Sequence, residues 1–235
     1  MSDCTYYAIG DVHGELAKLD ELLRFIREDA TRRNALHRVV FLGDLIDRGP
    51  DSRGVVERAK QLVEQGEAIA IKGNHEELML HAYANRESVG IYWWAENGGD
   101  ETIQSYMMAN GVRDDFRDAI DKAHIDWLAR LPVMVRDEER GLVFVHGGID
   151  PKIFPACSEE VKMWTRSRAF FNSERWPARA ETKDILVVHG HTPTADFEPE
   201  LQRRRINVDT GACFGGPLTA AVLAPGEPPR FLRAA

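Results

Sequence analysis

Five short glycine-containing segments constrain this chain more than any other feature of its sequence. They read GDVHG at residues 10–14, GDLIDRG at 43–49, GNHE at 73–76, HGG at 146–148 and HGHT at 189–192. Each follows directly on a short apolar run of the kind that forms a buried strand. Ligand sites in open α/β sheets lie just beyond the carboxyl ends of the strands. We therefore expect strands to bring these five loops together at one edge.

The rest of the pattern predicts an α/β chain with two packed sheets and helices outside them. In the first half, strand-like runs alternate with helical periodicity, and the last third is rich in short strands. Residues 85–130 have a mostly helical pattern rich in aromatic residues, which we interpret as core packing; a substrate-facing role for Trp93 or Trp94 is the less favoured interpretation. Strands are expected at 6–9, 39–42, 68–71, 133–135, 142–145, 186–188, 206–208, 218–223 and 231–232, and helices at 16–26, 55–63 and 76–84.

Composition limits the classes of protein to which the chain can belong. With 235 residues, 43% of them hydrophobic, it can form one sizeable core, so we expect a single domain over residues 1–235. Its net charge of -8 argues against a nucleic-acid coat protein, and no apolar run is long enough to cross a bilayer. Cys4, Cys157 and Cys213 form no CxxC pair, which favours a reducing cytoplasm. We expect a cytoplasmic monomer without nucleic-acid or membrane partners.

The five loops together contain carboxylate, amide and imidazole groups. Such mixed oxygen and nitrogen ligands suit manganese, iron or zinc better than calcium. They are too many for one ion, and a carboxylate can bridge two ions at about 3.5–4 Å. A lone histidine is more often structural, and His37, His81 and His124 lack such a setting. The candidate ligand-type residues are Asp11, His13, Asp44, Asn74, His146, His189 and His191.

The motifs, in this order, resemble those of the calcineurin-like metallophosphoesterases. Within that superfamily they look like the bacterial and phage branch of the phosphoprotein phosphatases, and the match runs from about residue 6 to 223. The resemblance implies a four-layer α/β/β/α sandwich with a helical insert at about 85–130. It also implies two divalent cations, with manganese favoured over iron or zinc. Asp11, His13 and His189 would hold the first ion with Asp44, which would bridge to a second ion completed by Asn74 and His146.

The resemblance also implies catalytic roles for four other residues. His75 would protonate the leaving oxygen while Asp47 orients it, and Arg48 and Arg166 would bind phosphate oxygens. A metal-bridging hydroxide would attack phosphorus directly. His191 and the segment NVDTGA at 207–212 would have only a supporting or loop role. A helix-capping ion pair for Asp47 and Arg48, and a solvated basic face for Arg166, stay open as simpler interpretations.

Three functions remain in competition. The resemblance favours hydrolysis of phosphomonoesters, above all phosphoserine and phosphothreonine in proteins, by a serine/threonine protein phosphatase. The alternative is a symmetrical diadenosine tetraphosphate hydrolase or another nucleotide or small-molecule phosphoesterase. The symmetrical enzymes carry Ala where this chain has Asp47 and GNHD where it has Glu76, which favours the phosphoprotein reading. A scaffold without activity is disfavoured, because every expected ligand position is filled.

Overall fold

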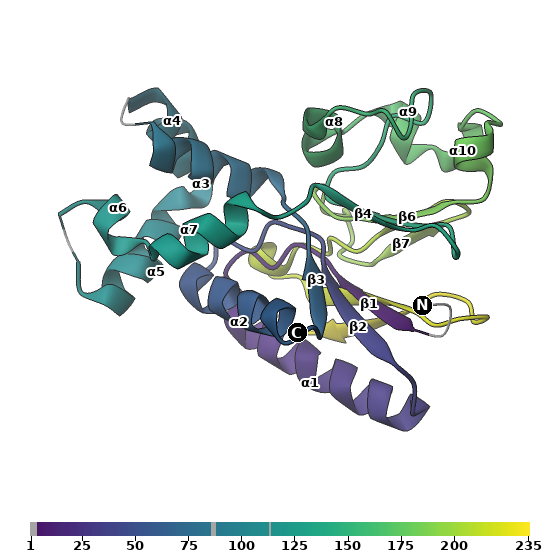
Figure 1. Ribbon diagram of the computed structural model, residues 1–235, viewed down its shortest axis with the longest axis horizontal. Helices are drawn as coiled ribbons and strands as arrows, with labels where there is room; N and C mark the ends of the chain where they lie inside the picture. The colour runs from purple at the N-terminus through teal and green to yellow at the C-terminus, as the bar shows by residue number, and fades with distance from the viewer. Residues whose placement is uncertain (1–3, 86–87, 113) are drawn as a thin grey trace.

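Two five-stranded mixed sheets form the centre of the molecule in the computed structural model, which describes residues 4–85, 88–112 and 114–235 (Figure 1). The first sheet has the order β10 (Arg230–Ala234), β9 (Leu218–Leu223), β1 (Thr5–Ile9), β2 (His37–Phe41) and β3 (Ala68–Ala70). The second has the order β4 (Met134–Asp137), β5 (Leu142–Val145), β6 (Leu186–His189), β8 (Arg205–Asn207) and β7 (Glu200–Gln202).

Each sheet has a parallel centre. In the first sheet β1, β2 and β3 run parallel, and β9 and β10 are antiparallel neighbours. In the second, β5, β6 and β8 run parallel, with antiparallel β4 and β7 at the edges. The loops that follow the parallel strands therefore leave each sheet on the same side, which places the glycine-containing segments together.

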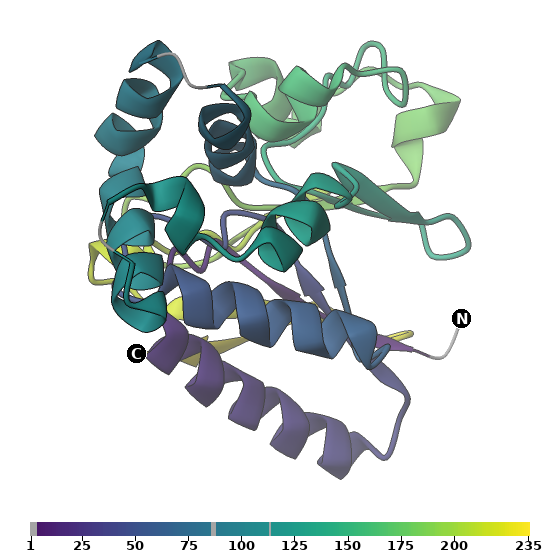
Figure 2. The same ribbon diagram turned by 60° about the vertical axis from the view of Figure 1, so that its left-hand side comes forward.

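Helices cover the outer face of each sheet (Figure 1). The first sheet packs on α1 (Leu16–Arg33) and α2 (Ser52–Glu64), and α8 (Glu159–Trp164), α9 (Arg168–Phe171) and α10 (Ala180–Lys183) lie over the second. A helical segment between β3 and β4 forms a lobe beside the sandwich (Figure 2). It contains α3 (Asn74–Ala84), α4 (Ser88–Trp94), a π-helical turn at Ala95–Gly99, α5 (Asp100–Asn110), α6 (Phe116–Ala119) and α7 (Lys122–Ala129).

Alternation along the strands builds separate apolar layers. Tyr6 and Ala8 of β1 face the core between the two sheets, where they meet Phe144 and Val188. The residue between them, Tyr7, faces the opposite core against the helices. A strand buried on both faces needs an apolar residue at nearly every position, which explains the continuous apolar runs. The layer order is helix, sheet, sheet, helix, and the predicted fold class is confirmed.

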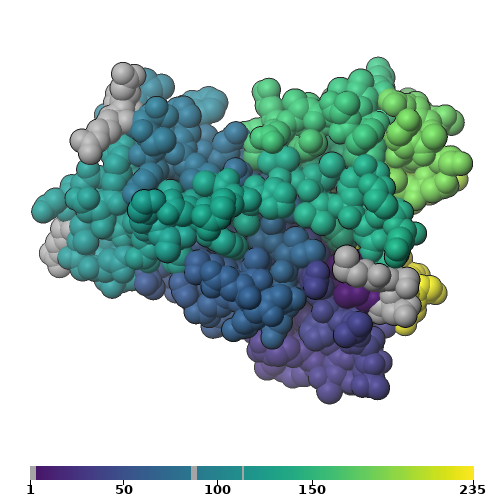
Figure 3. Space-filling model, in the orientation of Figure 1, coloured from purple at the N-terminus to yellow at the C-terminus, as the bar shows by residue number. Residues whose placement is uncertain are grey.

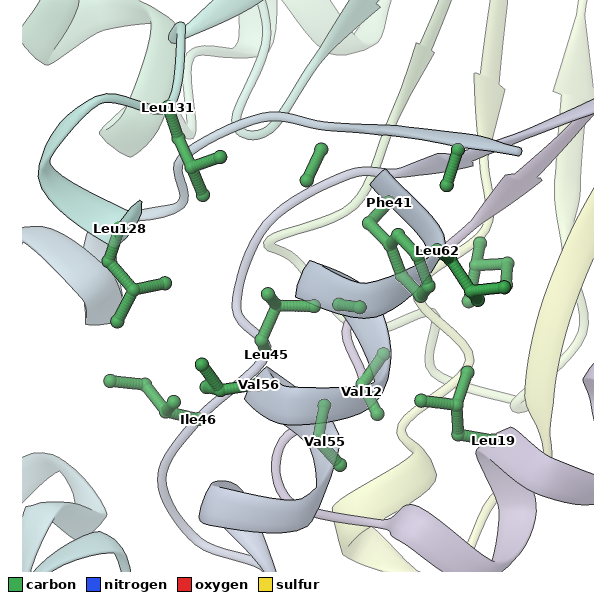
Figure 4. Packing of buried hydrophobic residues seen from close by; sticks show 14 of the residues in the cluster. Val12, Leu19, Phe41, Leu45, Ile46, Val55, Val56, Leu62, Leu128 and Leu131 are labelled. Carbon is green, nitrogen blue, oxygen red and sulfur yellow. The ribbon is translucent and has the colours of Figure 1, made fainter. Parts of the chain in front are cut away.

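Apolar residues inside the glycine-containing loops anchor those loops to the core. Val12 lies between Asp11 and His13, and Leu45 and Ile46 follow Asp44; the three apolar side chains are at most 1% exposed. Figure 4 shows them packed around Val55 and Val56 of α2. Burial of these side chains fixes the loop backbone, so their polar neighbours are held in position.

Several boundaries differ from the expected ones. Helix α3 begins at Asn74, so Asn74 and His75, which were expected in a loop, lie in its first turn. Strand β7 and the short helices α8, α9 and α10 were not predicted, since elements of three to six residues carry too little periodicity. The helical pattern expected over 85–130 includes residues 86, 87 and 113, which lie outside the described residues. No helix in the described part of the chain is long and apolar enough to span a membrane.

Candidate metal centre

The carboxylate of Asp44 lies at the centre of the converging loops. Its Oδ2 atom is 3.6 Å from Nε2 of His13, 3.8 Å from Nε2 of His75 and 3.3 Å from Nε2 of His146. Two groups among the described residues could hold a metal ion, His13–Asp44–His75 and Asp44–His146–His191, and Asp44 belongs to both. The geometry therefore suits one carboxylate shared by two cations.

Asn74 completes the second group. Its Oδ1 atom lies 2.8 Å from Nε2 of His146 and 2.8 Å from Nδ1 of His191. Four oxygen and nitrogen atoms, from Asp44, Asn74, His146 and His191, thus converge on one point inside the protein. This is the mixed donor set that suits a transition-metal ion.

Backbone carbonyl groups orient two of the imidazoles. Nδ1 of His13 donates to the Ile46 carbonyl oxygen at 2.7 Å, and Nδ1 of His146 donates to that of Leu42 at 2.9 Å. In the neutral form, which binds a metal ion, each ring carries its proton on Nδ1 and turns the lone pair of Nε2 toward Asp44. Metal-binding histidines are commonly oriented in this way.

Strained backbone accompanies the loops. Among described non-glycine residues, seven have φ in the left-handed region, and five of these are His13, Asp44, Asp47, Arg48 and His191. Such conformations are costly and persist where surrounding contacts enforce them. Glycines make room for the carboxylates, since a Cβ atom at Gly73 would lie 2.2 Å from Oδ1 of Asp44 and one at Gly190 2.0 Å from Oδ1 of Asp11. Tight approach of backbone to ligand-type groups thus depends on glycine here.

Asp11 lies beside the cluster and accepts hydrogen bonds from the backbone N–H of His191 at 3.0 and 3.1 Å. Burial, with repulsion from Asp209 and Asp44, raises the pKa of Asp11 well above its usual range. Burial also raises the pKa of Asp209 to about 6. Several carboxyl groups buried together cannot all ionise without compensating positive charge, and a bound cation supplies that charge. The residues present therefore fit a divalent metal centre.

Histidine pKa values within the cluster move in opposite directions. Burial lowers the pKa of His13 and of His191, in each case to about 3, so both imidazoles are neutral. Burial also opposes the charged form of His146, but Asp44 and Asp11 outweigh it and raise the pKa of His146 to about 10. Neutral imidazole is the form that binds a metal ion.

The structure contradicts the prediction of His189 as a metal ligand, because His189 does not join the cluster. Its Nε2 atom lies 3.0 Å from a guanidinium nitrogen of Arg205, and its Nδ1 lies 2.9 Å from the Gly190 carbonyl oxygen. His189 ends β6 one residue after Val188, which faces the core between the sheets, so its ring points to the outer layer against Phe170. Side chains alternate along a strand, and this alternation excludes His189 from the site.

His191 joins the cluster instead of His189, and it lies in the second group, with Asn74 and His146, not in the first. It stands two residues further on, in a turn with a positive φ of 70°, and its ring contacts the His146 ring with centroids 5.0 Å apart. His191 was expected to have only a supporting role. The alternation of side chains along the strand would have distinguished the two histidines. The sequence alone does not fix which face of the sheet a residue takes at the end of a strand.

The expected acid, His75, is paired with a buried carboxylate. Nδ1 of His75 lies 2.7 Å from Oδ2 of Asp47, which is completely buried. Asp47 also accepts hydrogen bonds from Nε1 of Trp94 at 3.0 Å and from the hydroxyl of Thr102 at 2.7 Å. Burial raises the pKa of Asp47, although these hydrogen bonds act in the opposite direction. Trp94 and Thr102 were not expected at the site, because the helical segment brings them there from 47 and 55 positions away.

The two expected phosphate-binding arginines lie on different sides of the cluster. A guanidinium nitrogen of Arg48 is 2.8 Å from Nε2 of His13, in the first group. Nε of Arg166 is 3.2 Å from Nε2 of His191, in the second. The simpler reading of Arg48 as a helix-capping ion pair with Asp47 is disfavoured, since Asp47 binds His75 instead.

Glu76 is a further residue that the sequence analysis did not assign to the site. Its carboxylate, which is completely buried, accepts the backbone N–H groups of Asp44 at 2.9 Å, Leu45 at 2.7 Å and Gly73 at 2.8 Å. One side chain therefore holds the loop after β2 to the loop after β3. The spacing of the two loops depends on its length.

The chain is similar to known phosphoesterases over most of its length. Residues 5–216 match the family described as calcineurin-like phosphoesterase. A bis(5'-nucleosyl)-tetraphosphatase PrpE, described as asymmetrical, from Oceanobacillus iheyensis is 28% identical over 224 residues, which are 90% of this chain and 86% of that protein. A similar relative from Anoxybacillus flavithermus is 28% identical over 92% of this chain and 89% of its own length.

Solved structures share the fold. A crystal structure assigned provisionally as a diadenosine tetraphosphatase superposes with a TM-score of 0.68 at 21% identity, covering 100% of this chain and 99% of its own. These relatives are named as tetraphosphatases, not as phage-type protein phosphatases. The expected resemblance is therefore confirmed for the superfamily and not for its protein phosphatase branch. Calcineurin-like phosphoesterases use divalent metal ions, and the groups around Asp44 could hold them. This chain belongs to the calcineurin-like phosphoesterase family.

Proposed function

We propose that this phosphoesterase hydrolyses dinucleoside tetraphosphates, with an asymmetrical cut that releases a nucleoside triphosphate and a nucleoside monophosphate. The carboxylate of Asp44, shared by two ligand groups, carries the proposal of hydrolysis at phosphorus, here of a phosphoanhydride bond. The choice of substrate is supported by the relatives named as asymmetrical bis(5'-nucleosyl)-tetraphosphatases, which are similar over nine tenths of this chain.

Two sets of side chains would hold the cations. Asp11 and His13 would hold one with Asp44, and Asn74, His146 and His191 would hold the other with Asp44; manganese suits this donor set. When bound, the two ions neutralise phosphate charge and lower the pKa of a water molecule at the site.

The remaining residues would position the phosphate chain and supply a proton. Arg48 and Arg166, each hydrogen-bonded to a different ligand group, would bind phosphate oxygens on the two sides of the cleavage point. His75, held by Asp47 through Nδ1, would present Nε2 toward Asp44 and protonate the leaving oxygen.

A second candidate is hydrolysis of phosphoserine or phosphothreonine in proteins. One observation favours it: the buried pair of His75 and Asp47. A serine alkoxide is a poor leaving group and needs a proton, whereas a leaving phosphate group needs one much less.

A side-by-side assay distinguishes the candidates. Manganese-loaded protein is incubated with diadenosine tetraphosphate and, separately, with phosphoserine and phosphothreonine peptides, and the products are separated by anion-exchange chromatography. The proposal predicts ATP and AMP in equal amounts. Only ADP would mean the symmetrical cut, and release of phosphate from peptides without dinucleotide cleavage would support the protein phosphatase.

A further inference from the structure

A cavity of about 470 Å³ opens at Trp164, whose ring faces His191 of the candidate metal centre. It lies between α3 and α4 on one side and α8 on the other, and Figure 3 shows a notch where the blue and green parts of the surface meet. Its lining residues are Glu77, Leu78, His81, Trp93, Glu160 and Trp164. The mechanism derived above uses none of them.

Trp164 links the cavity to the candidate metal centre, because it lines the cavity and its ring faces a residue of the centre. The Trp164 ring lies 6.1 Å from the ring of His191, centroid to centroid. Nε1 of Trp164 donates to Oε2 of Glu77 at 3.2 Å, which ties α8 to α3 across the cavity. Arg166, two residues beyond Trp164, contacts the same histidine. A ligand whose phosphate lies against Arg166 would therefore extend over Trp164.

Two of the five tryptophans of this chain line the cavity. Trp94, Trp127 and Trp176 are core residues, with at most 6% of their surface exposed. Trp93, in contrast, is 61% exposed, and Trp164 is half-buried. An exposed indole beside a phosphate site offers a flat face on which a base can stack.

The two ends of the site carry opposite charges. Arg48 and Arg166 lie at the metal centre, whereas the exposed carboxylates of Glu77 and Glu160 line the cavity. Carboxylates repel phosphate but accept hydrogen bonds from the exocyclic amino group of a base. The arrangement orients a nucleotide with its phosphates at the arginines and its base in the cavity.

We propose that the cavity between Trp93 and Trp164 binds one adenine base of the substrate, by stacking on indole and by hydrogen bonding of its amino group to Glu77 or Glu160. This inference rests on the proposed function, since it assigns a binding site for one end of the dinucleotide. It names the residues that would distinguish a nucleotide from a simple phosphate ester.

Competition between two monophosphates tests the inference without dinucleotide cleavage. AMP and ribose 5-phosphate share the phosphate and the sugar, and only AMP has a base. Both are used as inhibitors of p-nitrophenyl phosphate hydrolysis by the manganese-loaded protein. We expect AMP to inhibit about 5- to 150-fold more tightly than ribose 5-phosphate, the range that base stacking on an aromatic side chain gives.

Variants then locate the base. Trp93→Ala, at a position that is 61% exposed, and Trp164→Ala should each reduce the ratio of the two inhibition constants toward one, and Trp164→Phe should keep most of it. The matched control is Tyr92→Ala, on the same helix and 68% exposed but outside the cavity, which should keep the wild-type ratio.

The possible outcomes separate the inference from the proposed function. Equal inhibition by AMP and ribose 5-phosphate in the wild type would overturn the inference even if diadenosine tetraphosphate is cleaved. A phosphopeptide whose KM rises in Trp93→Ala, with no preference for AMP, would mean that the cavity binds peptide and would also overturn it. A ratio that depends on Trp93 and Trp164, in protein that does not cleave the dinucleotide, would uphold the base site and refute the proposed substrate.

Discussion

Nδ1 of His75 lies 2.7 Å from Oδ2 of Asp47, and both side chains are buried beside the candidate metal centre. Trp94 and Thr102 hold the same carboxylate from the helical segment between β3 and β4. The orientation of His75 therefore depends on residues that are remote in sequence. This segment is a structural support of the site as well as a lobe beside the sandwich.

The first prediction concerns proton donation by His75. His75→Ala should lower kcat by about 10²- to 10⁴-fold on a phosphoserine peptide, because the serine alkoxide must be protonated. The loss should be much smaller on p-nitrophenyl phosphate, whose leaving group needs little protonation. Steady-state kinetics on both substrates check this, with metal content measured as a control. Equal losses on the two substrates would remove His75 from the acid role.

The second prediction separates two histidines of one loop. His191→Ala should reduce the manganese bound per chain, because its Nδ1 joins Asn74 and Asp44. His189→Ala should keep the metal, since Arg205 occupies its Nε2. Elemental analysis of the two purified variants measures the bound manganese, after circular dichroism has shown that each variant is folded. Metal loss in His189→Ala alone would restore the ligand set expected from sequence.

Prediction from sequence succeeded where the pattern is local. Apolar runs followed by glycine and a polar residue located the strands and the loops, and the structure brings Asp44, Asn74 and His146 from those loops close together. The choice between His189 and His191 could not be made, because it depends on which face each residue takes at the end of β6. Trp94 was expected to be core, and it is, but its hydrogen bond to Asp47 is a tertiary contact that no local pattern contains.

The third prediction concerns Glu76, which accepts three backbone N–H groups while completely buried. Glu76→Gln keeps the volume but turns an amide N–H₂ toward those donors. It should destabilise the protein by about 1–3 kcal/mol, the cost of leaving a buried polar group unsatisfied. Urea denaturation measures the change. Glu28→Gln, at a surface ion pair with Arg24, is the control and should change the stability by less than about 1 kcal/mol. Similar effects of both substitutions would contradict the role given to Glu76.

The fourth prediction is a pH dependence of stability at Asp29. Burial raises the pKa of this carboxyl, but hydrogen bonds from Tyr7, Arg230 and Arg33 outweigh it, so that the pKa lies below its usual value. A carboxyl with a lowered pKa stabilises the folded protein above its unfolded pKa of about 3.9. That contribution is lost as the pH falls through the folded pKa.

Asp29→Asn should accordingly destabilise the protein at pH 7, by about 1.5–3 kcal/mol for a hydrogen-bonded charge. The difference from the wild type should shrink as the pH is lowered below about 4. Urea denaturation at a series of pH values provides the measurement. Asp20→Asn, in a half-exposed pair with Arg58, is the control and should show a small effect at every pH. A constant difference between wild type and Asp29→Asn down to the lowest pH would refute the account of this carboxyl.

The central claim is that two cations share the carboxylate of Asp44. Anomalous diffraction from a crystal grown with manganese tests it most directly. We predict two anomalous peaks, one on each side of Asp44: the first against His13 and Asp11, the second against Asn74, His146 and His191. A map with no peak beside Asp44, or with manganese bound only elsewhere, would contradict the claim.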